Sequence, residues 1–287
     1  MLEIFNYWQV NLTLAILLFV IMHQNYRIVG QRVKGTSNMA VITGIIGSVV
    51  FILLIPFFEL KFPSDWRIYA LLLLSNVFYV GQDLLKFKSY KYLDISVISI
   101  LFQISKVFFI IYGLLFFKET LTFYEMIGIG LILFGSGMVS FRRSKFEINK
   151  HSWLVIGSAL AFATAMSIDV GISKQFNLPF YLLMIYFIPA SAIFIGGRKN
   201  IKMIKRDFIG TERNWYYLII AGITSAFGML FYLLALRQGQ VSIVAPISSL
   251  TVLLNVFAGY IFLKERDDLG KRVLAAVIAI IGVILLV

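Results

Sequence analysis

Apolar residues run in ten blocks of about 20 along the chain, separated by short polar connectors. A block of that length can cross the hydrocarbon of a bilayer as a helix. The blocks are continuously apolar and do not alternate, which favours helices over the strands of a barrel. The pattern predicts an all-α integral membrane protein. The predicted spans are 8–26, 38–58, 66–85, 95–117, 123–141, 152–172, 178–196, 215–236, 241–263 and 269–287.

One segment of the chain occurs twice. Residues 90–119 and 236–265 align at an offset of 146 positions, and both copies end on a Lys-Glu pair. Self-similarity at about half the chain length indicates two copies of one unit, each of which needs the other to close a shared core. The predicted repeats are 8–141 and 152–287.

Each repeat holds five spans, and an odd number of spans places the second repeat upside down relative to the first. Two inverted halves can exchange conformations of similar energy, which moves access to a central cavity from one side of the membrane to the other. We therefore predict ten transmembrane helices arranged as two inverted five-helix repeats. The alternative is a duplicated scaffold that packs without moving a solute.

The composition agrees with this pattern and removes other classes of protein. Hydrophobic residues make up 60% of the 287 residues, and the mean hydropathy is +0.90, whereas apolar usage in soluble domains is nearer half. The net charge of +12 comes from connectors between the apolar blocks, where membrane topology signals place basic residues. We therefore expect the lipid bilayer as a partner, and no nucleic acid.

Glycines at positions 128, 130, 135 and 137 of the fifth span, with small residues in the tenth, predict close packing of helix backbones. The ninth span contains Pro246, and the fourth and ninth end on the Lys-Glu pairs. These features resemble the EamA branch of the drug/metabolite transporter superfamily over essentially the whole chain. The resemblance implies a ten-helix secondary transporter, often an exporter of amino acids, other metabolites or drugs, with a cavity between its halves. Fold-level analogy leaves the substrate open.

Basic residues are unevenly distributed between the two sides of the membrane. Connectors on the side of the chain termini carry five, and connectors on the opposite side carry twenty. Because cytoplasmic loops hold the excess of Lys and Arg, the count predicts both termini outside the cytoplasm. The family resemblance implies both termini inside it, so the two orientations remain open.

Lys106 is the most costly residue of the apolar blocks, since a basic residue near the middle of a span costs about 2.5 to 3.5 kcal/mol on an insertion scale. It shares one helical face with Ser96, Ser99 and Gln103, at intervals of three and four residues. Lys106 should therefore face a cavity or a partner. Three interpretations remain open: Lys106 binds an anionic group of the substrate, pairs with an internal carboxylate, or snorkels to the membrane interface.

The third span carries a comparable polar face, formed by Asn76, Tyr79, Asp83 and Lys86. Asp83 is the best candidate partner for Lys106 on the sequence alone. The alternative is an ion pair between Asp83 and a lysine at the end of its own helix.

Pro246 interrupts the ninth span, because proline removes one helical hydrogen bond. Ser248 and Ser249 follow it and can bond either the freed carbonyls or a ligand. Transporters place substrates where helices break at the bilayer midplane. A packing kink without a ligand is the alternative.

His23 in the first span and Asp169 in the sixth are candidates for binding a coupling proton or ion, although residues near helix ends are more often interfacial. No metal or cofactor is expected, because neither histidine belongs to a cluster with metal-ligand spacing and the chain has no cysteine. The absence of a phosphate-binding loop argues against ATP-driven transport by this chain alone.

These observations predict a non-enzymatic secondary transporter in the plasma or inner membrane, which moves a small polar or amphipathic molecule. In one of the interpretations of Lys106, that molecule carries a carboxylate. A membrane-embedded enzyme acting on lipids or prenyl chains and a non-transporting scaffold are the alternatives. The predicted substrate contacts are Asn76, Tyr79, Asp83, Ser99, Gln103, Lys106, Ser248 and Ser249.

Overall fold

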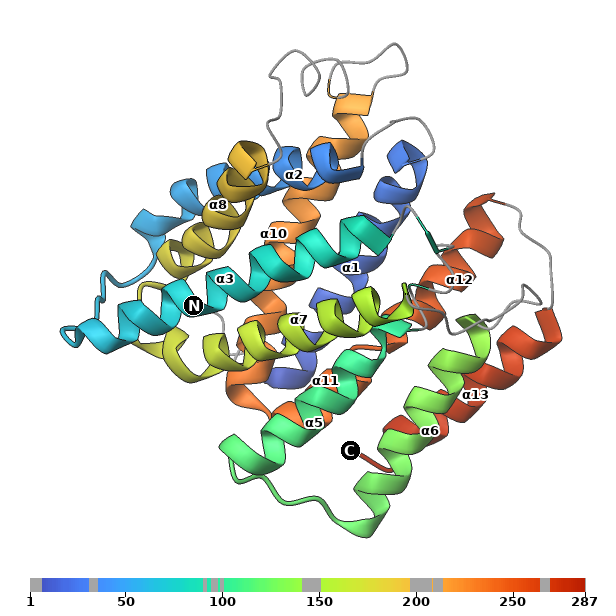
Figure 1. Ribbon diagram of the computed structural model, residues 1–287. Coiled ribbons are helices and arrows are strands. Elements are labelled where there is room, and N and C mark those ends of the chain that lie inside the picture. The colour runs from blue at the N-terminus through green and yellow to red at the C-terminus, as the bar shows by residue number, and fades with distance from the viewer. Residues whose placement is uncertain are drawn as a thin grey trace.

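The computed structural model describes residues 7–30, 36–89, 92–93, 98, 101–140, 151–196, 208, 214–263 and 269–286, and the elements of these residues are helical (Figure 1). The first half contains α1 (Trp8–Gly30), α2 (Thr36–Leu54), α3 (Trp66–Ser89), α5 (Ile104–Phe116) and α6 (Phe123–Ser140). The second half contains α7 (Ser152–Ile172), α8 (Leu178–Gly196), α10 (Asn214–Gln238), α11 (Val241–Ile247), α12 (Leu250–Leu263) and α13 (Leu269–Ile284).

The helices follow the apolar blocks closely, and the predicted fold class is confirmed. Within the described residues, five helices are long and apolar enough to cross a membrane, and four shorter apolar helices accompany them. The sixth and seventh spans match their predicted bounds to the residue. The fourth span differs, because its regular α5 begins at Ile104, and part of the stretch before it, including Ser99, lies outside the described residues.

The ninth span is split into α11 and α12, and the break at residues 248–249 lies just after Pro246. The helix ends one residue after the proline, and two serine hydroxyls then bond nearby carbonyls. Ser248 donates to the carbonyl of Ala245 at 2.7 Å, and Ser249 donates to that of Pro246 at 2.5 Å. Side-chain hydroxyls thus satisfy carbonyls that a broken helix would leave exposed to hydrocarbon.

The packing of the helices has the symmetry expected of two inverted repeats. Helix α1 of the first half packs on α10 of the second, and its counterpart α7 packs on α3 of the first. The pairs α2–α8, α5–α11 and α6–α13 each join a helix to its own counterpart. Figure 1 shows α6 beside α13 at one end of the molecule and α2 beside α8 at the other. Exchanging the halves therefore leaves the pattern of packing unchanged.

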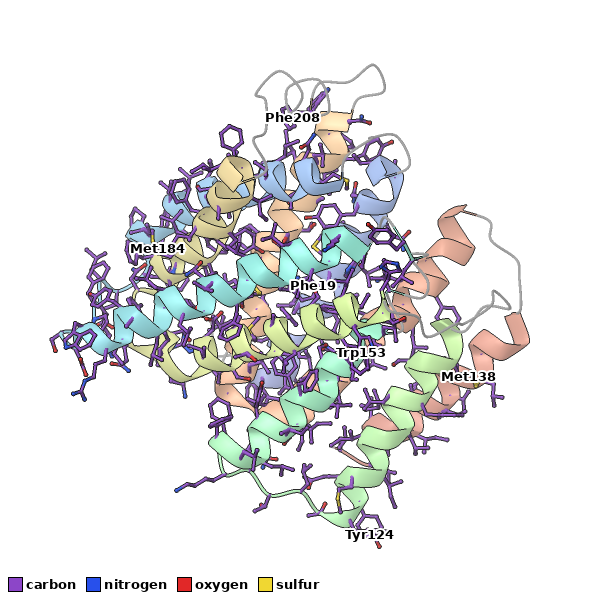
Figure 2. All side chains as sticks on the ribbon, in the orientation of Figure 1. Phe19, Tyr124, Met138, Trp153, Met184 and Phe208 are labelled. Atoms are coloured by element: carbon purple, nitrogen blue, oxygen red, sulfur yellow. The ribbon has the colours of Figure 1, made fainter. Side chains whose placement is uncertain are left out.

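The outer surface is apolar, as a lipid-facing surface must be. Side chains such as Tyr124, Phe134, Leu115 and Ile284 are well exposed, and Tyr124 projects from the outer end of α6 in Figure 2. Phe19, near the centre of the same view, instead packs edge-on against Tyr232, with ring centroids 6.0 Å apart. Large apolar side chains on the outside are tolerated because the surrounding solvent is hydrocarbon.

Helices α6 and α13 approach until their backbones touch. A Cβ atom added to Gly128 would lie 2.7 Å from the carbonyl oxygen of Gly282, and one added to Gly135 would lie 2.7 Å from that of Ala275. Close packing is thus confirmed at these two glycines. The expectation is wrong for Gly130 and Gly137, because a Cβ added at either meets nothing within 4 Å.

Replacing Gly128 by leucine is expected to lower the thermal stability of the purified protein, because the added side chain meets the α13 backbone. Overpacking of this kind costs about 1 to 3 kcal/mol. Gly130→Leu on the same helix is the matched control and should leave the apparent Tm unchanged or raised, since glycine is a poor helix former. Equal Tm values for the two variants would contradict the backbone contact.

Candidate functional site

The Lys106 ammonium lies between the two halves. Its Nζ donates a hydrogen bond to the Ser248 hydroxyl at 2.8 Å and stands 5.8 Å from the ring centroids of both Phe109 and Tyr232. Among the described residues it makes no ion pair with a carboxylate. A hydroxyl and two ring faces thus surround this charge.

Two buried polar atoms near this lysine have no hydrogen-bonding partner within the described part of the chain. The Tyr232 hydroxyl lies near Ser248 but makes no hydrogen bond of adequate geometry, and the side chain is 2% exposed. Gln103, one turn before Lys106, has an unpaired amide oxygen. A buried polar atom without a hydrogen bond costs free energy. A ligand that bonds the Tyr232 hydroxyl or the Gln103 amide oxygen would remove that cost.

The two serines after Pro246 point to different parts of the molecule. Ser248 accepts the hydrogen bond from Lys106, whereas Ser249 accepts one from Ser136 of α6 at 3.1 Å. Ser249 is 1% exposed and holds α6 against the break in the ninth span. The geometry therefore puts Ser248 in the site with Lys106, and Ser249 in the packing behind it.

A second polar centre surrounds Asp169 on α7, and this side chain is fully buried. The Tyr79 hydroxyl donates to Asp169 Oδ2 at 2.7 Å, and the Tyr181 hydroxyl donates to Oδ1 at 2.6 Å. No basic side chain pairs with the carboxylate in the described ranges. Tyr79, predicted as a substrate contact beside Lys106, thus lies with Asp169, and it links the first half to the second.

The other predicted residues of the third span stay apart from Lys106. The Asn76 amide donates to the Leu72 carbonyl of its own helix at 2.8 Å. Asp83 is partly buried, and Lys86, one turn further along α3, is the charge that acts on it. The expected pairing of Asp83 with Lys106 is therefore wrong for this structure, because the rotation of α3 presents Tyr79 to α7 and leaves Asp83 beside its own lysine.

His23 lies near the end of α1 and is exposed. Lys86 is the charge that acts on it. No hydrogen bond or ion pair joins His23 to Asp169 in the described parts of the chain. The two coupling candidates are thus separate, and only Asp169 is held by polar partners from both halves.

The side of the membrane on which α1 begins is hereafter the termini side, and there the halves are joined through Glu119. Its carboxylate accepts hydrogen bonds from the backbone N–H groups of Val241 and Ser242, at 2.6 and 2.9 Å. Lys118 adopts a left-handed conformation with φ of 54°, which turns the chain after α5 so that Glu119 faces the first turn of α11. A carboxylate at a helix N-terminus satisfies two orphan donors at once.

Further hydrogen bonds between the halves lie on the termini side. The Asn177 amide donates to the carbonyls of Phe58 and Glu59 at 3.2 and 3.0 Å. At the start of α1, Asn11 donates to Gln238 at the end of α10, at 2.8 Å. On the termini side, therefore, polar contacts join the two repeats to one another.

Sequence reasoning missed Tyr232, Ser136 and the partner of Glu119. Tyr232 lies in an apolar block whose polar residues on the same face, Thr224 and Ser225, are two turns away, so the pattern gives little to separate it from core tyrosines. For Glu119 a signal was present, because the Lys-Glu pair is repeated. A repeated charged pair at a span end indicates a shared structural role, but it does not identify the helix that the carboxylate contacts.

Two inverted helical repeats around a partly buried ammonium and a fully buried carboxylate define a multi-pass membrane protein built like a transporter. The EamA-like transporter family matches residues 8–141 and 150–287. The chain belongs to the EamA-like transporter family, and it is a multi-pass membrane transporter.

Individual relatives agree with this assignment. A Sinorhizobium protein named as an uncharacterised transporter in the cobO 3′ region is 28% identical over 131 residues, 44% of this chain and 89% of that protein. An uncharacterised protein of Methanocaldococcus jannaschii is 39% identical over 82 residues, 29% of this chain and 59% of its own length. A solved crystal structure superposes with a TM-score of 0.75, covering 97% of this chain and 95% of that chain at 11% identity, which shows a common fold.

Proposed function

We propose that the protein is a secondary transporter that carries a small organic anion across the plasma or inner membrane by alternating access. The observation that supports this most is the environment of Lys106, where an ammonium between the halves is held by a hydroxyl and ring faces. A charge at membrane depth is stable only when it is paired or solvated. A carboxylate or another oxyanion on the substrate supplies the missing charge.

The remaining groups at Lys106 extend the chemistry of the proposed substrate. The Tyr232 hydroxyl can donate a second hydrogen bond to the same anionic group, and the unpaired oxygen of Gln103 can accept one from a donor on the substrate. The rings of Phe109 and Tyr232 offer apolar contact beside the charge. The preferred solute is therefore a compact amphipathic anion that also carries a hydrogen-bond donor.

Alternating access is supported by the symmetry of the fold together with the contacts that join the repeats on the termini side. Inverted halves have two equivalent packings, and this structure has polar contacts between the repeats on one side of Lys106. Opening that side requires these contacts to break. Because the halves are pseudo-symmetric, exchanging their conformations would form an equivalent set of contacts on the opposite side.

Exchange in proteoliposomes tests the proposal. Vesicles containing purified protein are loaded with an unlabelled solute and given the same solute in radiolabelled form, over a panel of small organic acids, amines and sugars. We expect transient accumulation of label for one or more organic acids and for neither other class. A membrane enzyme would convert the solute and a scaffold would show no accumulation, and either result would contradict transport.

We further propose that Asp169 binds the coupling proton. Its carboxylate is fully buried, accepts hydrogen bonds from tyrosines of both halves, and lacks a basic partner within the described residues. A carboxylate in such a place costs less when it is protonated. Gaining or losing the proton changes the hydrogen bond from Tyr79, and thereby the link between the repeats.

Asp169→Asn is expected to abolish accumulation of solute driven by a proton gradient while leaving exchange without a gradient in place. Asparagine resembles the protonated acid in shape and charge, so it keeps hydrogen-bonding partners for the tyrosines but cannot release a proton. The control is Asp65→Asn, an exposed aspartate ahead of α3. Gradient-driven accumulation that survives in Asp169→Asn would remove Asp169 from the coupling step.

A further inference from the structure

A chain of aromatic rings joins the polar centre at Lys106 to the one at Asp169. Phe162 of α7 lies in the middle of this chain, with its ring centroid 6.5 Å from that of Tyr79 and 5.8 Å from that of Phe109. Ring centroids about 4.5 to 7 Å apart are those of rings in contact. The Tyr79 hydroxyl bonds Asp169, and the Lys106 ammonium stands over the ring of Phe109. The rings of Tyr79, Phe162 and Phe109 thus form a continuous path between the two centres.

Helix α7 lies between the helices that supply the partners of Phe162. Figure 1 shows α7 with α3 on one side and α5 on the other, and both helices pack on it. Tyr79 belongs to α3 and Phe109 to α5. Phe162 and Asp169 are seven positions apart on α7, which is about two turns of a helix, so the two side chains share one face. A movement of α7 therefore displaces the carboxylate and the ring together.

These contacts all cross between the two repeats. Helices α3 and α5 belong to the first repeat and α7 to the second, and the hydrogen bond from Lys106 to Ser248 crosses in the same way. In a cycle of alternating access the repeats repack against one another. A solute at Lys106 and a proton at Asp169 would therefore bias the same rearrangement, and Phe162 lies where the two effects meet.

Tyr79 is the group that connects Asp169 to this chain of rings. In the described part of the protein, the side chains facing Asp169 are Tyr79 and Ser75 of α3 and Tyr181 of α8. All of them are neutral hydroxyl groups, so they hold the carboxylate by hydrogen bonds. Of the three, Tyr79 has its ring against that of Phe162. A change in the charge state of Asp169 therefore reaches Phe162 through Tyr79.

Close packing carries the change onward to Lys106. Phe109 is fully buried and Tyr79 is 7% exposed, so neither ring has empty space to move into. The rings of Phe162 and Phe109 meet at an interplanar angle of 88°, with the edge of one against the face of the other. Packed interiors respond to such a push by switching between discrete arrangements. The ring beneath the Lys106 ammonium therefore moves when Tyr79 moves.

We propose that Phe162 is a positioning residue through which the charge state of Asp169 sets the place of the Lys106 ammonium. This role rests on the proposed function and deepens it, because it couples the proton to the solute. Protonation weakens the hydrogen bond from Tyr79, since a bond to a charged acceptor is stronger than one to a neutral group. The three rings then repack, and the ammonium moves relative to the solute. Because coupling is reciprocal, the solute changes the proton affinity of Asp169 by the same factor.

Fluorine NMR without any solute tests this coupling in the full chain. Phe109 is replaced by para-fluorophenylalanine, and its fluorine resonance is compared between the protein with Asp169 and the Asp169→Asn variant, which stands in for the protonated acid. We expect Asp169→Asn to shift the resonance, and we expect Phe162→Leu to abolish that shift. Leucine keeps an apolar side chain but lacks the flat ring that reaches both neighbours. Phe162→Met is measured alongside, so that a folding defect of one replacement does not decide the outcome.

Phe51 of α2 supplies the matched control. Its side chain is fully buried, and its ring centroid lies 5.4 Å from that of Tyr186 in the second repeat, so it is also an aromatic contact between the repeats. Phe51→Leu should leave the shift caused by Asp169→Asn in place. A shift that survives in both Phe162→Leu and Phe162→Met would overturn the proposal. Asp169→Asn without any shift, while Phe162 is present, would overturn it equally.

Transport measurements distinguish a failure of this coupling from a failure of the proposed function. In proteoliposomes without a gradient, Phe162→Leu should still exchange the organic acid that the wild type exchanges. Its accumulation of that acid under a proton gradient should fall to the level of Asp169→Asn, whereas Phe51→Leu should accumulate it as the wild type does. Full gradient-driven accumulation by Phe162→Leu would remove Phe162 alone from the coupling step. A wild type that exchanges no organic acid would instead reject the proposed function, whatever the fluorine spectra show.

Discussion

Exchange of the transported organic acid is expected to fall roughly 10- to 150-fold in Lys106→Met at low solute concentration, since a hydrogen bond to a charged group contributes about 1.5 to 3 kcal/mol. Methionine keeps a long side chain but removes the charge, so the variant loses the group that would pair with the substrate anion. It also removes an ammonium from the apolar span, which lowers the cost of inserting α5. The fold should therefore survive the substitution.

Lys174→Met is the matched control, because Lys174 follows α7, is exposed, and lies apart from both polar centres. Exchange by this variant should equal that of the wild type. Thermal stability of both purified variants is measured alongside, so that a folding defect is separated from loss of the site. Wild-type exchange by a stable Lys106→Met protein would show that the ammonium does not bind the solute.

Glu119→Gln is expected to open the termini side of the protein. Each hydrogen bond from Val241 and Ser242 ends on a charged carboxylate, and the amide replaces one acceptor by a donor that faces another N–H group. Losing one such bond shifts the population of the closed state by roughly 10- to 150-fold. A cysteine placed at Ser242, which is fully buried in the closed state, should become reactive to a membrane-impermeant maleimide.

A second glutamate supplies the control for this variant. Glu125 accepts a hydrogen bond from the backbone N–H of Thr122 at the start of α6, so it caps a helix within one half, and among the described residues its side chain makes no hydrogen bond to the other repeat. Glu125→Gln should leave the cysteine at position 242 protected. If both variants label at the same slow rate, the carboxylate of Glu119 does not hold the gate shut.

The sequence predicts the helices well because each span must be apolar along its whole length. It also identifies Lys106, since a charge within an apolar block is costly wherever the helix points. The partner of Lys106 was not predictable in the same way. Ser248 and Asp83 both lie on polar faces, and only the rotation and packing of α3 and the ninth span bring one of them to the ammonium.

The sequence did not predict the polar centre at Asp169 for the same reason, because it does not give the rotation and packing of the helices. Tyr79 has the correct spacing to share a face with Asn76 and Asp83, yet its hydroxyl lies at the end of a long side chain and reaches Asp169 on α7. Periodicity places Cβ atoms on a face, and it does not give the direction of a ring. Pro246 is the converse case, because its effect is local, and the ninth span is interrupted close to it, between α11 and α12.

Alternating access itself is most directly tested by the rate at which a cysteine at position 242 is modified from the termini side during solute exchange. The chain has no native cysteine, so the signal belongs to that position alone. In resting vesicles the thiol should be protected, and the rate should rise when the exchanged organic acid is present on both sides of the membrane. A thiol that stays protected while exchange proceeds at full rate would contradict a termini-side gate that opens in every cycle.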